Sequence, residues 1–362
     1  MDQETWIDDA VAKAVTRARG IVRETKDFPH ITTNGDWQCT PDGVWTGGFW
    51  AGVLWLAYEY DGGEDLYRSA VGFTERLLPR SSDTRNHDLG FMFYPSAIKA
   101  WTLKGDERYR QTAVEAAVSL GRQFNEKAGF IPGWGFFGKE DWSGSVLVDT
   151  LMNLPLLVWA VQQGADAGLM EVVRGQVAKT LEHHLRPDGS VYHVYRFDPA
   201  TGEGAGGDTY QGLSPDSSWS RGQAWAITAL AILAAMTADR NYQATSERVA
   251  DYFLSQLPAD GVPPWDFTAR GSDVPKDSSA GAIASYGFIK LYGITQDRRH
   301  LETATRLLNA MAMTCANASN GGGLLLHATA DLPHGLGIDG TTMYGDYYYL
   351  KSLLALRALL RS

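Results

Sequence analysis

Cysteine is almost absent from this sequence of 362 residues, which contains only Cys39 and Cys315. Two cysteines so far apart support neither a disulfide framework nor a structural zinc site, which needs three or four ligands. We therefore expect a core that is stable without cross-links and a protein that holds no metal.

Positive charge is also scarce, since 32 Lys and Arg residues face 42 Asp and Glu residues and give a formal net charge of −10. This balance, without a basic cluster, makes nucleic acid an improbable partner. No run of eighteen apolar residues occurs, and the first residues are acidic where an export signal would be basic and then apolar. We expect a cytoplasmic protein with no membrane span.

Several catalytic motifs are missing, namely the G-x-S-x-G elbow, the P-loop and H-E-x-x-H. The glycine-rich residues 204–207 do not follow a strand and open a helix, as a dinucleotide-binding loop would. His183 and His184 could suggest a metal site, but they end a predicted helix, where a cation complements the dipole, so we expect them to be structural. No cofactor is expected. The unusual feature is instead the 12 Trp and 16 Tyr residues, many beside Gly and Asp, which suits stacking on sugars; a place in the core is the alternative for any one of them.

Apolar residues recur mostly at helical spacing, and twelve helical stretches can be counted. Six have a charged face typical of helices with one side in water: 4–25, 63–80, 106–125, 166–184, 240–256 and 297–316. Six are poor in charge, as expected of helices buried on several sides: 47–60, 91–104, 146–163, 220–238, 279–292 and 345–360.

The two kinds alternate strictly, outer then inner, which predicts an all-α (α/α)6 barrel of six helical hairpins. The uneven spacing of the outer stretches argues against an open solenoid. No linker divides the chain, so we expect a single domain over residues 1–362. The longest stretches without helical periodicity, 126–145, 186–219 and 257–278, are short enough to be loops at the rim.

Unusual residues gather at the start of each inner stretch. They are Trp45 to Trp50, His87 to Gly90, Asp149 and Thr150, Ser220 to Gln223, Asp277 to Ser279, and Tyr344 to Asp346. If the inner helices are parallel, all six groups meet at one mouth of the barrel. Helix N-termini would make that mouth favour an anionic ligand.

Two aspartates are candidates for chemistry at this mouth. Asp149 stands between apolar residues, and a carboxyl group buried there is expected to have a raised pKa, as a general acid requires; the alternative is a buried helix cap or an arginine partner. Asp88 follows His87 and could simply cap the helix near residue 91. Two carboxylates in an aromatic cleft are typical of glycosidic bond cleavage, but the sequence does not give their separation.

Other polar residues near the mouth have weaker signals. Arg221, flanked by Trp219 and Trp225, is suited to a substrate carboxylate, with a structural ion pair as the alternative. His193 and Gln211 lie in the long segment before that helix. We expect the remaining polar residues at helix starts to be caps, namely Asp277, Ser278 and Asp346.

Seven motifs, in this order, resemble the unsaturated glucuronyl hydrolases of glycoside hydrolase family 88. They are Trp45 to Trp50, His87 to Phe91, Asp149 with 151–157, Trp219 to Trp225, Trp265 to Phe267, Lys276 to Ala280 and Gly345 to Leu350. The likeness covers about residues 28 to 360. It implies an (α/α)6 barrel, which agrees with the helix count.

The resemblance also implies a reaction, the removal of a Δ4,5-unsaturated uronic acid from the non-reducing end of oligosaccharides made by polysaccharide lyases. Asp149 would protonate the C4=C5 double bond and assist water addition at C5, with Asp88 supporting the charge distribution. The matched positions further imply that His193, Gln211 and Arg221 bind the unsaturated sugar, that Trp134 and Trp225 stack on it, and that Trp45 and His87 line the pocket.

Substrate choice is less well defined. Family members that act on sulfated fragments tend to carry Ser and Lys near the last inner helix, whereas residues 341–346 here contain no cation, so we expect unsulfated substrates. Three alternatives stay open: an unsaturated rhamnogalacturonyl hydrolase, an inverting glycosidase on saturated glycans, and a non-catalytic carbohydrate-binding helical protein. The leaving sugar, the linkage and the oligomeric state are not set by the sequence.

Overall fold

The computed structural model describes residues 3–133, 142–318 and 321–361. The outer helices are α1 (Gln3–Glu24), α3 (Glu64–Leu77), α6 (Glu107–Gly121), α8 (Leu169–His183), α10 (Arg240–Gln256) and α12 (Arg298–Thr314). The inner elements are α2 (Gly47–Asp61), α4 (Leu89–Phe93) with η2 (Tyr94–Ile98) and α5 (Lys99–Lys104), η3 (Val148–Asn153) with α7 (Leu154–Gln162), α9 (Ser220–Thr237), α11 (Ser278–Thr295) and α13 (Met343–Leu360). A short 3-10 helix, η1 (Leu78–Ser82), follows α3.

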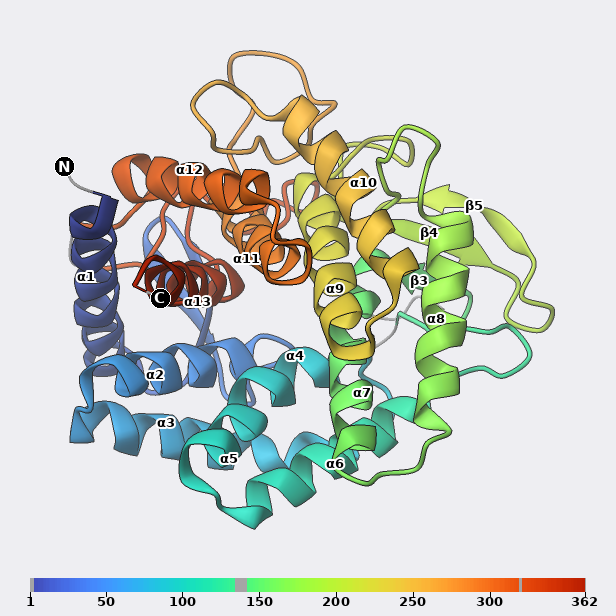
Figure 1. Cartoon of the computed structure of the whole chain (residues 1–362), viewed down its shortest axis with the longest axis horizontal. Coiled ribbons are helices and arrows are strands. Elements are labelled where there is room, and N and C mark those ends of the chain that lie inside the picture. Colours follow the sequence, from blue (N-terminus) through green and yellow to red (C-terminus); the bar gives the residue numbers. More distant parts are fainter. Residues whose placement is uncertain (1–2, 134–141, 319–320, 362) are drawn as a thin grey trace.

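The inner elements form a closed ring. Helix α2 contacts α4, α4 contacts α7, and the series continues through α9, α11 and α13 back to α2. Helix α1 lies beside α13 and α12, so the two ends of the chain meet in the ring (Figure 1). The predicted (α/α)6 barrel is confirmed.

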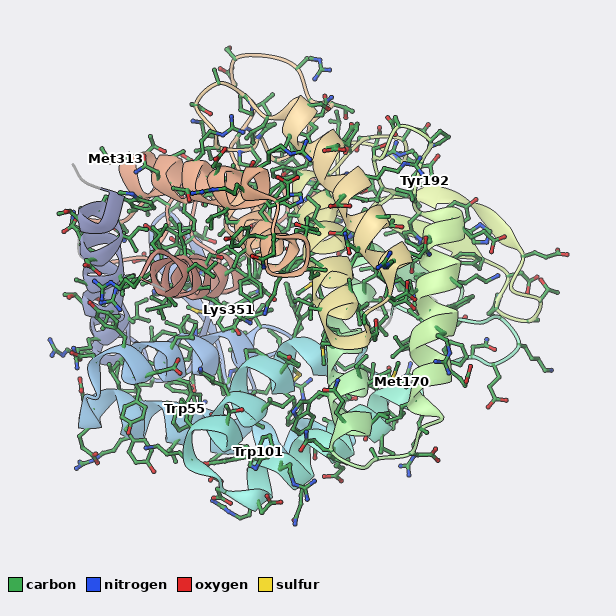
Figure 2. The ribbon with its side chains drawn as sticks, in the orientation of Figure 1. Trp55, Trp101, Met170, Tyr192, Met313 and Lys351 are labelled. Atoms are coloured by element: carbon green, nitrogen blue, oxygen red, sulfur yellow. The ribbon has the colours of Figure 1, made fainter. Side chains whose placement is uncertain are left out.

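Inner and outer helices differ in how much of their surface is buried. In α9 every residue from Ser220 to Ala234 is buried, whereas α12 buries the stripe Ala304, Leu307, Leu308 and Met311. That stripe has the spacing of one helix face. Accordingly, Met313 of α12 lies at the edge of the molecule, while Lys351 of α13 lies toward its middle (Figure 2).

Aspartate caps fix the starts of several outer helices. The carboxylates of Asp106, Asp239 and Asp297 accept backbone N–H groups in the first turns of α6, α10 and α12. Gly62 and Gly105 follow α2 and α5 in the left-handed conformation that ends a helix.

Five short strands were not predicted. Strands β1 (Phe28–Thr33) and β2 (Asp36–Thr40) form an antiparallel pair, and β4 (Val194–Phe197) lies between β3 (Ser145–Leu147) and β5 (Gly204–Asp208) in an antiparallel sheet. The expectation of plain rim loops over 126–145 and 186–219 was therefore incomplete. Strand β3 leads directly into η3, which carries Asp149. None of the described helices has the length and apolarity needed to cross a membrane.

Candidate active site

A cleft with about 560 Å³ of empty space opens where the inner elements begin. Four of its residues stand just before or within the first turn of an inner element: Trp45 before α2, Asp88 before α4, Asp149 in η3 and Tyr344 in α13. The described residues that line it are His30, Ile31, Trp45, His87, Asp88, Leu147, Asp149, Tyr210, Gln211, Ala330, Asp331, Leu336 and Tyr344. Helix starts that are far apart in sequence thus meet at one mouth.

Asp149 has the environment of an acid. The residue is 9% exposed, and its Oδ1 is buried with no hydrogen-bond partner among the described residues. Burial first, and then the neighbouring charge of Asp88, raise the pKa of Asp149 to about 7. A carboxyl group of this kind keeps a proton available near neutral pH, so it can act as a general acid.

Asp88 lies beside Asp149 and differs from it in its partners. Asn153 Nδ2 donates to Asp88 Oδ1 at 3.2 Å, and His87 Nε2 lies 3.4 Å from the same oxygen. Burial raises the pKa of Asp88, while His87 and Asn153 oppose that rise. Within the described chain Asp88 makes no side-chain cap to α4, although it occupies the N-cap position. The helix-cap alternative for Asp88 is therefore not what the structure contains.

Aromatic rings form one wall of the cleft. Trp45 stacks on Tyr344 with ring centroids 5.2 Å apart and planes 19° apart, and His30 meets Trp45 edge-on at 6.1 Å. Burial lowers the pKa of His30 to about 4, so this ring is neutral. Trp45 and His87 were predicted to line the pocket, and Tyr344 was placed at the mouth without a role, whereas His30 was not predicted. Tyr344 had a signal, its place at the start of the last inner helix, whereas His30 lies on the unpredicted strand β1.

His193 and Gln211 border the same region from the segment before α9. Gln211 lines the cleft, and its Nε2 donates to the Ala330 carbonyl at 2.8 Å. The backbone N–H groups of Tyr210 and Gln211 donate to His193 Nδ1 at 3.2 and 3.3 Å, so the neutral ring carries its proton on Nε2. Burial holds the pKa of His193 well below its usual value, and within the described residues Nε2 has no partner.

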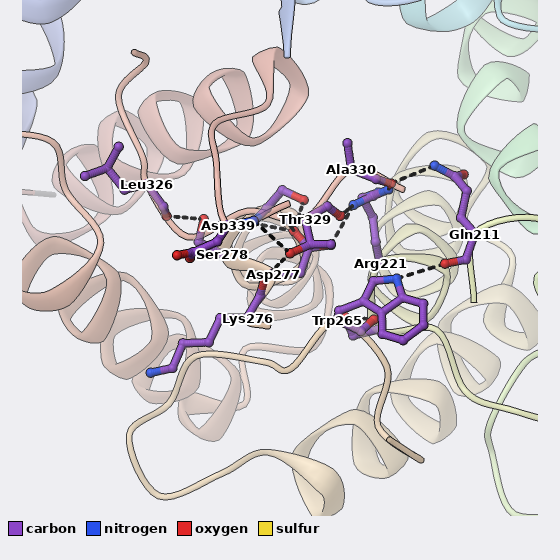
Figure 3. Close-up of polar contacts among 12 residues, drawn as sticks. Gln211, Arg221, Trp265, Lys276, Asp277, Ser278, Leu326, Thr329, Ala330 and Asp339 are labelled. Carbon is purple, nitrogen blue, oxygen red and sulfur yellow. Dashed lines mark hydrogen bonds and ion pairs between the residues drawn. The ribbon is translucent and has the colours of Figure 1, made fainter. Parts of the chain in front are cut away.

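Arg221 lies behind the cleft in a buried ion pair (Figure 3). Its Nη1 donates to Asp277 Oδ2 at 2.6 Å and to the Thr329 carbonyl at 2.7 Å, and its Nη2 donates to the Ala330 carbonyl. The guanidinium also lies over the ring of Tyr344 at 4.9 Å and is 1% exposed. The structure thus contains the ion pair that was the alternative for Arg221, in place of a guanidinium open to a substrate carboxylate.

Trp225 also lies beneath the cleft. It is 1% exposed and packs on Phe91 and Tyr348, with ring centroids 5.0 and 5.6 Å away. This packing in the core does not favour the stacking role that the resemblance implied for Trp225, which stays a prediction. Trp134, the other tryptophan implied, falls within 134–141 and lies outside the described residues.

The three expected helix caps have different outcomes. Asp277 caps α11 by accepting the N–H of Ser279 at 3.2 Å, as predicted. Ser278 instead donates to the Leu326 carbonyl, and Asp346 lies inside α13, where it accepts the N–H of Leu325. Burial raises the pKa of Asp346 to about 7. The described residues contain no group of three or more His, Cys, Asp or Glu that could hold a metal ion.

Known proteins are similar to this chain in sequence and in fold. Residues 11–348 match the model of Glycosyl Hydrolase Family 88. The chain is 34% identical over 352 residues to the unsaturated glucuronyl hydrolase of Bacillus sp. (strain GL1), covering 94% of this chain and 93% of that protein. It is 35% identical over 342 residues to an unsaturated chondroitin disaccharide hydrolase of Streptococcus pyogenes serotype M1, covering 91% and 85%.

Solved structures give the same result. The crystal structure of the unsaturated glucuronyl hydrolase from Bacillus sp. GL1 superposes with a TM-score of 0.92 at 32% identity and covers 96% of both chains. That of an unsaturated glucuronyl hydrolase specific for heparin gives 0.93 at 29% identity and covers 99% of both.

Proposed function

The chain belongs to glycoside hydrolase family 88, and we propose that Asp149 is the acid with which it releases unsaturated glucuronic acid from lyase-generated oligosaccharides. It is a glycosidase. The observation that carries the residue assignment is the buried Oδ1 of Asp149, which has no partner among the described residues, next to the better partnered carboxylate of Asp88.

The difference between the two carboxyl groups favours a proton on Asp149. Asp88 receives a hydrogen bond from Asn153 and has His87 beside it, and both favour its ionised form. Asp149 has no such donor on Oδ1 among the described side chains and backbone groups. Two adjacent carboxyl groups that cannot both ionise easily share one proton, and here Asp149 is the better place for it.

In the proposed reaction Asp149 donates its proton to C4 of the C4=C5 double bond. The positive charge that develops at C5 and the ring oxygen is stabilised by the Asp88 carboxylate. Water then adds to C5 and gives its proton to the Asp149 carboxylate, which restores the acid. The product is a hemiketal, and its opening releases the leaving sugar.

Neighbouring side chains would orient the sugar ring. Trp45 offers an aromatic surface in the cleft, and Gln211 and the Nε2–H of His193 offer polar contacts. Arg221 contributes from behind, because its charge opposes the rise in the pKa of Asp149 and so keeps this acid strong enough to protonate carbon.

We also propose that the substrate is unsulfated. None of the described residues that line the cleft is Lys or Arg, and Asp331 adds a carboxylate there. A sulfate would meet this carboxylate, with no lysine or arginine among the described lining residues to balance it. We expect kcat/KM for the unsulfated unsaturated chondroitin disaccharide to exceed that for its 6-sulfated form by about tenfold or more. Equal values for the two disaccharides would contradict this preference.

The reaction is tested with lyase products of chondroitin, hyaluronan, heparin, gellan, xanthan and ulvan, each paired with its saturated counterpart. Loss of the ultraviolet absorbance of the double bond is expected only with unsaturated substrates, and in D2O the product should carry one deuterium at C4. Turnover of saturated substrates alone would support the inverting-glycosidase alternative instead.

A further inference from the structure

Asp88 occupies a position where aspartate normally caps a helix. It stands directly before α4, and an N-cap side chain usually accepts the N–H of the second or third helical residue. Here the third residue is Phe91, and its N–H donates to Asn153 Oδ1 at 2.8 Å. The cap of α4 thus comes from η3, 62 residues away in sequence.

The side-chain amide of Asn153 also contacts the carboxylate of Asp88, whose place at the cap it takes. Asn153 Nδ2 donates to Asp88 Oδ1 at 3.2 Å, and since the Oδ1 of Asn153 is held by Phe91, the direction of the amide is fixed. Asn153 is 0% exposed. A Cβ at Gly90 would lie 2.3 Å from Asn153 Cα, so glycine at this position is what lets α4 and η3 approach.

Asp149 and Asn153 are four residues apart on η3. We propose that Asn153 is a positioning residue that caps α4 in place of Asp88 and holds the freed Asp88 carboxylate beside Asp149. This inference rests on the proposed function. Without Asn153, the unpaired N–H of Phe91 would attract Asp88 back to the cap, since a buried N–H without a partner is costly.

The test compares pH profiles of kcat and KM for the unsaturated chondroitin disaccharide. In Asn153→Leu, which lacks both the acceptor and the donor, we expect kcat to fall about 10- to 100-fold, as for one hydrogen bond to a charged group, with KM changed only a few-fold. When Asp88 returns to the cap, it exchanges the donor of Asn153 for the N–H of Phe91, so the acidic limb of the pH profile should stay close to its original pH. As Asp88 turns away, repulsion on Asp149 weakens, so the basic limb moves to lower pH.

Asn153→Asp separates the two roles. It keeps an acceptor for Phe91 but replaces the donor to Asp88 by a like charge, so both limbs should move to higher pH. The other charged groups acting on the pair, His87, Arg80 and Arg221, are unchanged in both variants. The matched control is Thr228→Val, which removes a buried hydrogen bond to the Ile283 carbonyl between α9 and α11; it should lower stability without moving either limb.

The inference would be overturned if Asn153→Leu kept the basic limb of its pH profile at the wild-type pH and a kcat within twofold of wild type. A crystal structure of that variant with Asp88 in its original position would also overturn it. If Asn153→Leu does not fold, the direction of the limbs in Asn153→Asp decides. Asp149→Asn, run in the same assay, reports on the proposed function separately, because its activity does not depend on what Asn153 does.

Discussion

Two regions of the barrel hold ionisable groups among aromatic rings. One is the cleft with Asp88 and Asp149. The other is a cavity of about 310 Å³ around Lys351, about two turns further along α13 than Tyr344. Phe91 lies between them, since it packs on Trp45 and lines the Lys351 cavity. In both regions burial disfavours the charged form, raising the pKa of Asp149 and lowering that of Lys351.

Their partners differ. Lys351 Nζ donates to Tyr347 Oη at 2.9 Å and lies 4.4 Å from the ring centroid of Tyr286, so its amine has a hydrogen bond and an aromatic contact that favours a cation. Asp149 has a second carboxylate beside it, an oxygen without a partner in the described structure, and a cleft in front. A shifted pKa in an aromatic cavity is therefore not sufficient to identify a catalytic group. A carboxyl oxygen without a hydrogen-bond partner, beside a second acid, is the stronger sign.

The largest effect is expected from Asp149→Asn. This change removes the proton donor while keeping the size of the side chain, so kcat/KM should fall about 10²- to 10⁴-fold. Initial rates with an unsaturated disaccharide measure the loss, and circular dichroism checks the fold. Lys351→Met is the matched control from the other region and should stay within about twofold. Equal losses in the two variants would remove the distinction between the regions.

Asp88→Asn should lower kcat about 10- to 100-fold, because the developing positive charge loses its carboxylate partner. It should also move the basic limb of the pH profile to lower pH, since the charge of Asp88 raises the pKa of Asp149. The measurement is kcat/KM as a function of pH. A basic limb that stays at its original pH would mean that the two carboxyl groups do not interact.

In the unmodified protein, activity should decline above about pH 7, because Asp149 must be protonated to act and its pKa is raised to about 7. The decline should approach tenfold per pH unit. Rates measured between about pH 5 and pH 9 in buffers of constant ionic strength test this. A profile that stays level through pH 8 would argue against Asp149 as the acid.

The smallest effect concerns stability. The pKa of Lys351 is lower in the folded than in the unfolded chain, so the unfolded chain binds a proton more readily. As the pH falls below the pKa of Lys351 in the unfolded chain, the protein therefore loses stability relative to a variant without this amine. Lys351→Met should therefore melt at a slightly higher temperature than the unmodified protein, with a difference that grows toward acidic pH. Thermal unfolding at several pH values measures it. A difference that shrinks as pH falls would show that the aromatic contacts keep Lys351 charged.

Much of the fold was visible in the sequence because the burial of each helix is encoded in its own residues. Charged faces marked α3 and α12, and charge-poor stretches marked α9 and α11, so the alternation of the ring could be read without contacts. The pairing of β3 with β4 was not visible, since it joins short segments about 50 residues apart through backbone groups that leave no side-chain pattern.

The site was also predicted only in part, because some of its residues have a local sequence signal and others depend on contacts between distant segments. Asp149 had a local signal, an acid within an apolar run. Arg221 and Trp225 stand near the start of a buried helix, as the cleft residues do. In the structure, however, Arg221 pairs with Asp277 and Trp225 packs in the core. Asn153 lies within one of the seven motifs, but the sequence assigned it no role, because its role comes from the residues that it contacts across the ring.

The sequence by itself determined the six helical hairpins, the family, and an acid that folding would bury, because hydrophobic periodicity and motif order are properties of consecutive residues. Only the tertiary structure decided which carboxyl group keeps a donor, which helix Asn153 caps, and whether Arg221 faces substrate or Asp277. These choices depend on closing the ring, which brings side chains from distant helices within hydrogen-bond distance and sets the electrostatic environment of each.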